Sequence, residues 1–246
     1  MKFFAHIGAY VQFLSRLFSR PEKFSMYWKE TFRQMNSIGI ESLPIILVVS
    51  LFIGAVTAVQ FAYQVQDFVV PMYYIGYIVR DTMIIEMAPT LSCMILAGKA
   101  GSNMASELGN MRISEQIDAM EIMGINTSAY LVGTKMIAAF AVVPFLVIFA
   151  AFIGIGGGLI ASVGGGFLTV AEFERGLHVF YNPFNIQLML IKSFVFAFIF
   201  SSLACFQGYN VKGGTLQLAA ASTKAVVYAD IFILLSDYVL AQSLLS

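Results

Sequence analysis

A few ionisable side chains lie within stretches of this 246-residue sequence that are otherwise apolar. A charge at the centre of a bilayer costs about 2.5 to 3.5 kcal/mol on insertion scales, so such a residue usually has a partner or a function. Glu86 lies about 14 residues into one apolar stretch, about 21 Å along a helix, and cannot easily reach water. Lys192 and Asp237 lie within two other stretches, and Arg33 precedes the first one. We therefore expect these four residues to form a binding site; the alternative is that Lys192 snorkels and Asp237 lies near an interface.

The sequence offers little support for other kinds of chemistry. No nucleophile, base and orienting residue occur in a recognisable set, so we expect no catalytic residues and no enzymatic activity. His178 has only Glu172 and Glu174 nearby, which are too few ligands, and we expect no metal site. The phosphate-binding motif GxxxxGK[ST] does not occur, so we expect this chain to bind neither ATP nor another cofactor itself.

The composition indicates the environment in which these residues must be placed. Hydrophobic residues make up 59% of the chain and charged residues 11%, whereas soluble domains carry about 25% charged residues. Such a chain cannot cover a water-facing surface, so we predict an integral membrane protein. Its 14 Lys and Arg balance its 14 Asp and Glu, so no overall field favours nucleic acid.

The uncharged intervals predict an all-α fold with five transmembrane helices, because a spanning helix needs about 20 apolar residues. The expected spans cover residues 42–66, about 72–98, 136–171 (including an outer loop), 185–209 and about 219–245. With the N-terminus inside, eleven of the 14 lysines and arginines lie in inner segments, and Arg80, Arg175 and Lys192 lie in outer ones. The positive-inside rule then places the N-terminus in the cytoplasm and the C-terminus on the outer side.

Residues 1–40 are expected to form a separate N-terminal region before a transmembrane domain over residues 41–246. Phe3, Ile7 and Tyr10 recur at helical spacing. This pattern predicts an amphipathic helix in the inner membrane interface, with arginines facing anionic headgroups. The alternative is a plain cytoplasmic tail.

Two stripes of small residues predict close helix packing, because helices in a bilayer associate where their backbones approach closely. One stripe contains Ser50, Gly54, Ala58 and Ala62, and the other contains Ala150, Gly154, Gly158 and Ser162. The spacing alone does not distinguish a contact within the chain from a dimer seam, and we take the internal contact as the default.

The longest polar segment between spans covers about residues 99–134 and joins the second span to the third. Its apolar residues recur at helical spacing, and Ser114 is expected to cap a short second helix. Acids outnumber bases in this segment, which favours a protein partner over an anionic membrane surface; the alternative is an interfacial helix that rests on lipid. The residues expected to contact the partner are Glu107, Gly109, Met111, Glu115, Asp118 and Met120.

The run ELGNMRISEQIDAMEIMG, with EMAP at 86–89 and AGKAGS at 97–102 before it, resembles the MlaE/YrbE permease family. These permeases are the membrane subunits of bacterial ABC systems that move phospholipids between the inner and outer membranes. The resemblance extends from about Arg33 to Asp237 through LPIILVVSLFIGAV, IKSFVFA and FQGYN. The departures from the family pattern are Lys99 for Arg, Thr127 for Pro, and Gly133, Thr134 and Lys135 for a Pro-Arg pair.

The resemblance implies a homodimer in the bacterial inner membrane, with a cavity for lipid at the dimer axis. Segment 99–134 would dock onto a cytoplasmic ABC ATPase dimer, which would bind ATP and Mg. An MCE-domain protein would sit on the periplasmic side, a STAS-type protein is a further candidate partner, and outer-membrane lipid asymmetry is the process served. Lys192 and Arg33 would then contact the phosphate of a phospholipid, and Glu86 and Asp237 would tune that contact or bind an amine.

A different class of function is a stand-alone carrier coupled to ions or protons, with Glu86, Asp230 and Asp237 as relay acids. That hypothesis leaves segment 99–134 unexplained, and five spans without an inverted repeat fit it poorly. An intramembrane enzyme is a third and weaker alternative.

Overall fold

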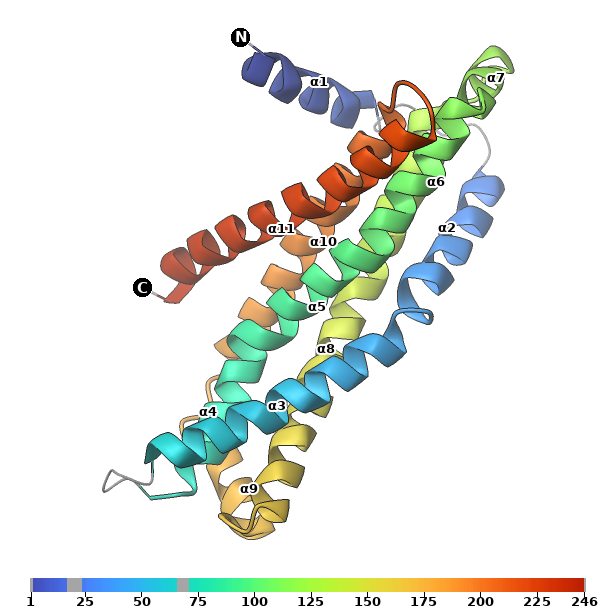
Figure 1. The fold of residues 1–246 in the computed structure, drawn as a ribbon. Helices are drawn as coiled ribbons and strands as arrows, with labels where there is room; N and C mark the ends of the chain where they lie inside the picture. Colours follow the sequence, from blue (N-terminus) through green and yellow to red (C-terminus); the bar gives the residue numbers. More distant parts are fainter. Residues whose placement is uncertain (1, 17–23, 66–70, 246) are drawn as a thin grey trace. The chain divides into compact units, whose positions relative to one another are not determined.

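The computed structural model describes residues 2–16, 24–65 and 71–245, and every regular element in these ranges is a helix. Figure 1 shows them in chain order. They are α1 (Lys2–Arg16), α2 (Phe24–Gly39), α3 (Leu43–Val65), α4 (Tyr74–Thr82), η1 (Met83–Met87), α5 (Ala88–Leu96), η2 (Ala97–Gly101), α6 (Ser102–Ile113), α7 (Gln116–Ile122), η3 (Ser128–Gly133), α8 (Thr134–Gly164), α9 (Val170–His178), α10 (Phe184–Tyr209) and α11 (Thr215–Leu245). The three η elements are π-helical turns.

Five helical runs in the described residues are long and apolar enough to cross a membrane, which confirms the predicted all-α membrane fold. They are Met26–Val65, Tyr74–Ile113, Ser128–Gly164, Phe184–Tyr209 and Thr215–Leu244. The second run has 40 residues, about twice what a spanning helix needs. Most of the first half of segment 99–134 is therefore not a loop, because α6 continues the second span without a break.

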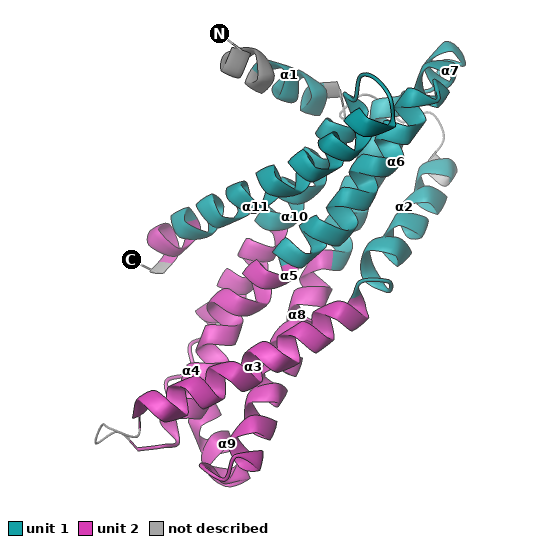
Figure 2. Cartoon of the chain, viewed as in Figure 1, with its two compact units in different colours: residues 1–42, 93–142, 195–239 teal, residues 43–92, 143–194, 240–246 magenta. Residues whose placement is uncertain are grey.

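The chain forms two compact units, drawn in different colours in Figure 2. Unit 1 contains residues 1–42, 93–142 and 195–239, and unit 2 contains residues 43–92, 143–194 and 240–246. The predicted division at residue 40 concerns placement in the membrane rather than packing, and it stays a prediction. The side chains of residues 1–7 and 16–25, including Lys2, Arg16, Arg20 and Lys23, lie outside the described part.

In unit 1, α1 packs against α10 through aromatic side chains. The Tyr10 hydroxyl lies 2.7 Å from the Ser202 hydroxyl, and Phe13 is 6% exposed against the ring of Phe206. Burial raises the pKa of Tyr10, so this phenol stays neutral. Part of the predicted apolar face of this helix is thus used for a contact within the protein, and the placement of α1 in an interface stays a prediction.

In unit 2, the two stripes of small residues lie against each other. A Cβ at Gly54 of α3 would overlap the carbonyl oxygen of Gly154 on α8, and a Cβ at Gly157 would overlap that of Leu51. The backbones therefore approach so closely that only glycine fits at these positions. The small residues on either side, Ser50, Ala58, Ala62, Ala150 and Ser162, are all buried.

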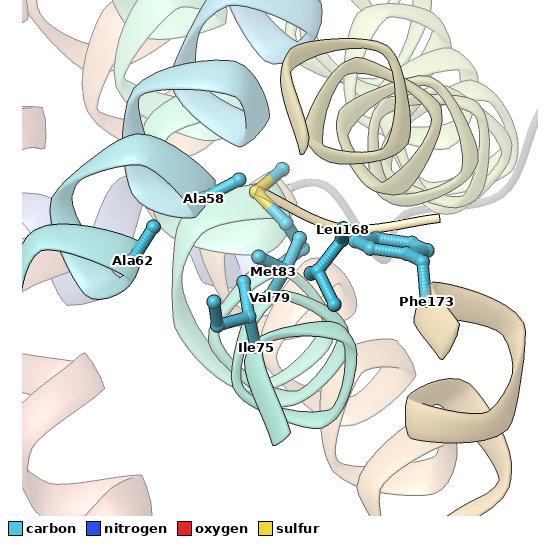
Figure 3. Close-up of a cluster of buried hydrophobic side chains, with 7 residues drawn as sticks. All are labelled: Ala58, Ala62, Ile75, Val79, Met83, Leu168 and Phe173. Atoms are coloured by element: carbon cyan, nitrogen blue, oxygen red, sulfur yellow. The ribbon is translucent and has the colours of Figure 1, made fainter. Parts of the chain in front are cut away.

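The core of unit 2 continues from this contact to α4 and α9. Figure 3 shows Met83 beside Ala58, with Ile75 and Val79 of α4 near Leu168 and Phe173. These side chains are no more than 5% exposed, so they form a continuous apolar cluster.

Helices α4 and α9 are also joined by a buried arginine. The Arg80 guanidinium pairs with Asp81 at 2.7 Å and donates to the backbone carbonyls of Leu177, Val179 and Phe180 at the end of α9. These carbonyls lack helical partners because the helix ends there. Sequence reasoning counted Arg80 only as a loop charge and missed this role.

The starts of the two short helices α9 and α7 are determined in different ways. Thr169 and Glu172 form a reciprocal cap at the start of α9, and the hydrogen bonds to its carboxylate hold the pKa of Glu172 below its usual range. The predicted cap at Ser114 is wrong: its hydroxyl donates back to the carbonyl of Asn110, and α7 starts after Glu115, whose φ is 58°.

We expect Gly54→Val to lower the stability of the folded chain by about 2 kcal/mol or more, because a side chain at Gly54 has no room between α3 and α8. The measurement is thermal unfolding of the purified protein in detergent. Gly156→Ala is the matched control, since a Cβ at Gly156 meets nothing within 4 Å. Equal melting temperatures for Gly54→Val and Gly156→Ala would contradict the close contact.

Candidate functional site

Lys192 occupies a core position of α10. Leu188, Lys192, Phe196 and Phe200 follow one another at four-residue spacing and are each 0% exposed. Residues four apart share one face of a helix, so the ammonium lies on the buried stripe where an apolar side chain is normal. A buried ammonium needs compensation, because removing it from water costs several kcal/mol.

Glu86 supplies that compensation from η1. The Lys192 Nζ donates to Glu86 Oε2 at 2.9 Å, and both residues belong to unit 2. The lysine side chain is 0% exposed, whereas that of the glutamate is 42% exposed. One member of the pair is therefore fixed inside the protein, and the other can be reached from outside it.

This asymmetric pair suits a zwitterionic or anionic ligand. A charge-assisted hydrogen bond between an ammonium and an anion is short and strong, and a phosphate oxygen can take the place that the Glu86 carboxylate holds on Lys192. The released Glu86 carboxylate can in turn accept a hydrogen bond from an amine. The geometry thus permits exchange of an internal ion pair for contacts with a charged headgroup.

The other two predicted headgroup residues belong to unit 1. Arg33 lies on α2 with a side chain that is 75% exposed, 3.7 Å from Glu30. Asp237 lies on α11 and is 6% exposed. Asp230, one of the alternative relay acids, lies about two turns before Asp237 on the same helix. Of the predicted set, the structure brings Glu86 and Lys192 together within unit 2.

Several of the residues expected to contact a partner also make contacts inside unit 1, and their contact with a partner stays a prediction. Glu107 forms an ion pair with Lys135, whose side chain is 2% exposed. A Cβ at Gly109 would overlap Leu218, close to Val211, so Gly109 serves helix packing. Lys135, one of the departures from the family pattern, is therefore a structural partner of Glu107.

Helix α7 is tied to the end of α10 by a three-way hydrogen-bond cluster. Glu121 Oε1 accepts from the hydroxyls of Thr127 and Tyr209, each at 2.9 Å, and these two hydroxyls lie 2.9 Å apart. Arg112 pairs with Asp118 at 2.6 Å and lies over the Tyr209 ring. Thr127, another departure from the family pattern, contributes a hydroxyl that proline lacks.

The most exposed apolar residues of this segment lie at the tip of α7. Ile122 is 88% exposed and Met123 is 68% exposed. Glu115 is also exposed, while Met111 and Met120 are half-buried. Sequence reasoning missed Ile122 and Met123, because helical spacing groups apolar residues on a face without saying whether the face is covered.

The sequence is similar to those of known permeases over most of its length. The family model described as "Permease MlaE" matches residues 31–243. A protein of Rickettsia prowazekii named "Probable ABC transporter permease protein" is 31% identical over 242 residues, which cover 98% of this chain and 93% of that protein.

Two further relatives carry more specific names. The "Intermembrane phospholipid transport system permease protein MlaE" of Haemophilus influenzae is 29% identical, with 85% of this chain and 80% of that protein covered. "Protein TRIGALACTOSYLDIACYLGLYCEROL 1, chloroplastic" of Arabidopsis thaliana is 28% identical, with 89% of this chain and 63% of that protein covered.

We expect Glu86→Leu to destabilise the chain more than Lys192→Met does. The first change removes the carboxylate from a fully buried ammonium and should lower the free energy of unfolding by about 2 kcal/mol. This is less than the loss expected for a fully buried ion pair, because the Glu86 side chain is partly exposed. The second change leaves a carboxylate that can reach outward and should cost less than about 1 kcal/mol.

Thermal unfolding of both single variants and of the double variant in detergent tests this expectation. The double variant should recover part of the loss of Glu86→Leu, because no cation then remains at position 192. Equal losses of stability in the two single variants would refute the energetic coupling between Glu86 and Lys192. A loss in the double variant equal to the sum of the two single losses would refute it as well.

Proposed function

Because the chain belongs to the MlaE permease family of ABC transporter permeases, we propose that it moves phospholipids between the inner and outer membranes of a bacterium. The observation that carries this proposal is the ion pair between the buried Lys192 and the half-exposed Glu86. The pair offers a charged headgroup both a cation and an anion at a depth where the surrounding side chains are apolar. The name of the Haemophilus influenzae relative supports phospholipid as the substrate.

In this proposal the chain is a non-catalytic subunit that binds no cofactor. ATP and Mg are bound by a cytoplasmic ABC ATPase dimer, and an MCE-domain protein is the periplasmic partner, with a STAS-type protein as a further component. Two copies of the chain form a homodimer in the inner membrane, with the N-terminus in the cytoplasm and the C-terminus in the periplasm. Outer-membrane lipid asymmetry is the process that the complex serves.

The tip of α7 is the proposed contact with the ATPase. Ile122 and Met123 lie exposed at the end of a short helix whose Glu121 and Asp118 side chains form a hydrogen bond and an ion pair inside unit 1. An apolar anchor on a segment that also exposes Glu115 and Glu121 fits a groove in a partner protein better than an anionic lipid surface. Met111 and Met120 are half-buried and would contribute less to this contact than Ile122 and Met123.

Movement of α7 reaches the headgroup site through α10. Tyr209 holds α7 at one end of this helix, and Lys192 lies on the same continuous helix about 17 residues earlier. Closure of the ATPase dimer would pull on the hydrogen bond between Tyr209 and Glu121 and change the contact between Lys192 and Glu86. ATP binding drives such a change only if the ATPase contacts the two states with different affinities.

Removing either charge should impair transport while the complex still assembles. We expect Glu86→Gln and Lys192→Gln each to reduce lipid transfer on the order of tenfold or more, because each removes a charge-assisted contact worth about 1.5 to 3 kcal/mol. Transfer of fluorescent phospholipid between vesicles by the reconstituted complex is the measurement.

Ser193→Ala is the matched control, since the adjacent buried Ser193 hydroxyl only donates to the carbonyl of Leu190 in its own helix. Transfer at the wild-type rate by both charge variants would exclude the pair from the lipid path. A pH- or potential-dependent flux that continues without ATP would instead favour the stand-alone carrier.

Substituting the α7 tip should separate the ATPase from the permease. We expect Ile122→Ser and Met123→Ser each to weaken capture of the ATPase on the order of tenfold, because central apolar anchors contribute most of an interface's binding energy. Val170→Ser is the control, as Val170 is an apolar residue of α9 that is 54% exposed. Undiminished capture by the Ile122→Ser, Met123→Ser double variant would show that the ATPase binds elsewhere.

A further inference from the structure

Tyr209, the last residue of α10, is contacted by side chains from several elements of unit 1. Its hydroxyl bonds to Glu121 of α7 and to Thr127. The centroid of its ring lies 5.6 Å from that of Phe13 on α1 and 6.0 Å from the guanidinium carbon of Arg112 on α6. The proposed path from α7 to α10 uses the Tyr209 hydroxyl and assigns no role to the contact with α1.

Helix α1 is attached to the face of α10 that ends at Tyr209. Ser202, Phe206 and Tyr209 are spaced by four and three residues, so they lie on one side of α10. The Tyr10 hydroxyl lies 2.7 Å from the Ser202 hydroxyl. The ring centroids of Tyr10 and Phe13 lie 5.3 and 5.5 Å from that of Phe206. Phe13 therefore reaches Tyr209 from a helix that two other residues of α10 already hold.

The Tyr209 side chain needs such support, because helix ends fray. A tyrosine in the last turn keeps its hydroxyl in one place only if packing holds its ring. Phe13 is 6% exposed, and its ring meets that of Tyr209 at an angle of 55°. Tilted contacts between aromatic rings are favourable, so the contact with Phe13 restricts where the Tyr209 hydroxyl can lie.

Helix α7 depends on its contacts for its own placement. It has seven residues, and an isolated helix of fewer than about 12 residues is marginal in water. Ile117 is 0% exposed, and Asp118 is paired with Arg112. Glu121 adds the hydrogen bond that it accepts from Tyr209. Displacement of the Tyr209 hydroxyl therefore removes one of the contacts that hold α7.

We propose that Phe13 positions α7 by holding the Tyr209 ring, so that the N-terminal helix α1 controls how firmly the α7 tip is presented. The consequence for the ATPase rests on the proposed function, in which this tip is the contact with the ATPase. The placement of α7 itself is internal to the chain, since Phe13, Tyr209 and Glu121 all belong to unit 1. Release of α1 from α10 would loosen α7 and thereby weaken binding of the ATPase.

Hydrogen exchange of the full-length chain in detergent, read by mass spectrometry, measures the placement of α7 without the ATPase. The amide of Met123 donates to the carbonyl of Ala119, and amides of this kind exchange faster when a helix opens locally. We expect Phe13→Ala to raise the exchange rate over residues 116–123 about three- to tenfold, because one aromatic contact is lost. Exchange in α9, which belongs to unit 2, should stay unchanged.

A double-mutant cycle with Tyr209→Phe distinguishes positioning from general support of unit 1. Tyr209→Phe keeps the ring and removes the hydroxyl that donates to Glu121, so it should itself raise exchange in α7 by a similar factor. Because Phe13 acts through that hydroxyl in this proposal, Phe13→Ala should add less than about twofold once Tyr209 is Phe. A purely structural role of Phe13 would instead multiply the two effects.

Two further variants complete the comparison. Val11→Ala is the matched control and should leave exchange in α7 unchanged, since Val11 is 58% exposed on the same helix. Phe13→Leu keeps an apolar side chain at the buried position and should raise exchange less than Phe13→Ala does. It replaces Phe13→Ala in the cycle if gel filtration shows that the alanine variant is not folded.

Unchanged exchange in α7 of the folded Phe13 variant would overturn the proposal, and so would effects that multiply in the cycle. Capture of the ATPase by the same variants is measured separately, and we expect Phe13→Ala to weaken it about threefold. Faster exchange in α7 with capture at the wild-type level would support positioning by Phe13 and refute the α7 tip as the ATPase contact. The failure of this proposal and that of the proposed function therefore give different results.

Discussion

Burying a cation among apolar helices costs several kcal/mol unless an anion or several carbonyl oxygens lie within hydrogen-bond distance. Among the side chains that the structure describes, three cations are almost completely buried, and each has such a partner inside its own unit. Lys192 has Glu86, Lys135 has Glu107, and Arg80 has Asp81 and the carbonyls at the end of α9. These pairings fix which helix faces can meet, so they select the packing as well as compensate the charges.

Close backbone contact is the second constraint on the packing. Helices in a bilayer gain little from the hydrophobic effect, because the surrounding lipid is as apolar as a leucine side chain. Glycine lets backbones meet at Gly54 and Gly154 in unit 2 and at Gly208 with Ala105 in unit 1. The large apolar side chains are then left to face outward, as Phe52 and Phe152 do at 62% and 70% exposure.

The spans, the close packing of the small-residue stripes and the need of Glu86 and Lys192 for a partner could be predicted from the sequence. Charge-free length, four-residue spacing and the cost of an isolated charge are all readable there. The pairing of Glu86 with Lys192 could not, since the residues lie 106 positions apart and only the helix packing brings them together. The same limit applies to Lys135 and Glu107. Sequence reasoning also treated residues 99–134 as one loop, because polar residues return at Lys99 and were taken to mark the end of a helix. In the structure, the π-helical turn η2 continues directly into α6.

The π-helical turn η1 has a consequence for how the Glu86–Lys192 pair can open. A π turn holds one residue more than an α turn, and such turns are frequent at functional sites. One residue corresponds to about 100° of rotation around the helix axis. Rewinding η1 to α geometry would turn Glu86 about the helix axis relative to α4 or α5, because the extra residue must be taken up on one side of the turn. A shift of one residue in the backbone hydrogen-bond register at η1 would therefore change the direction in which the Glu86 carboxylate points relative to Lys192.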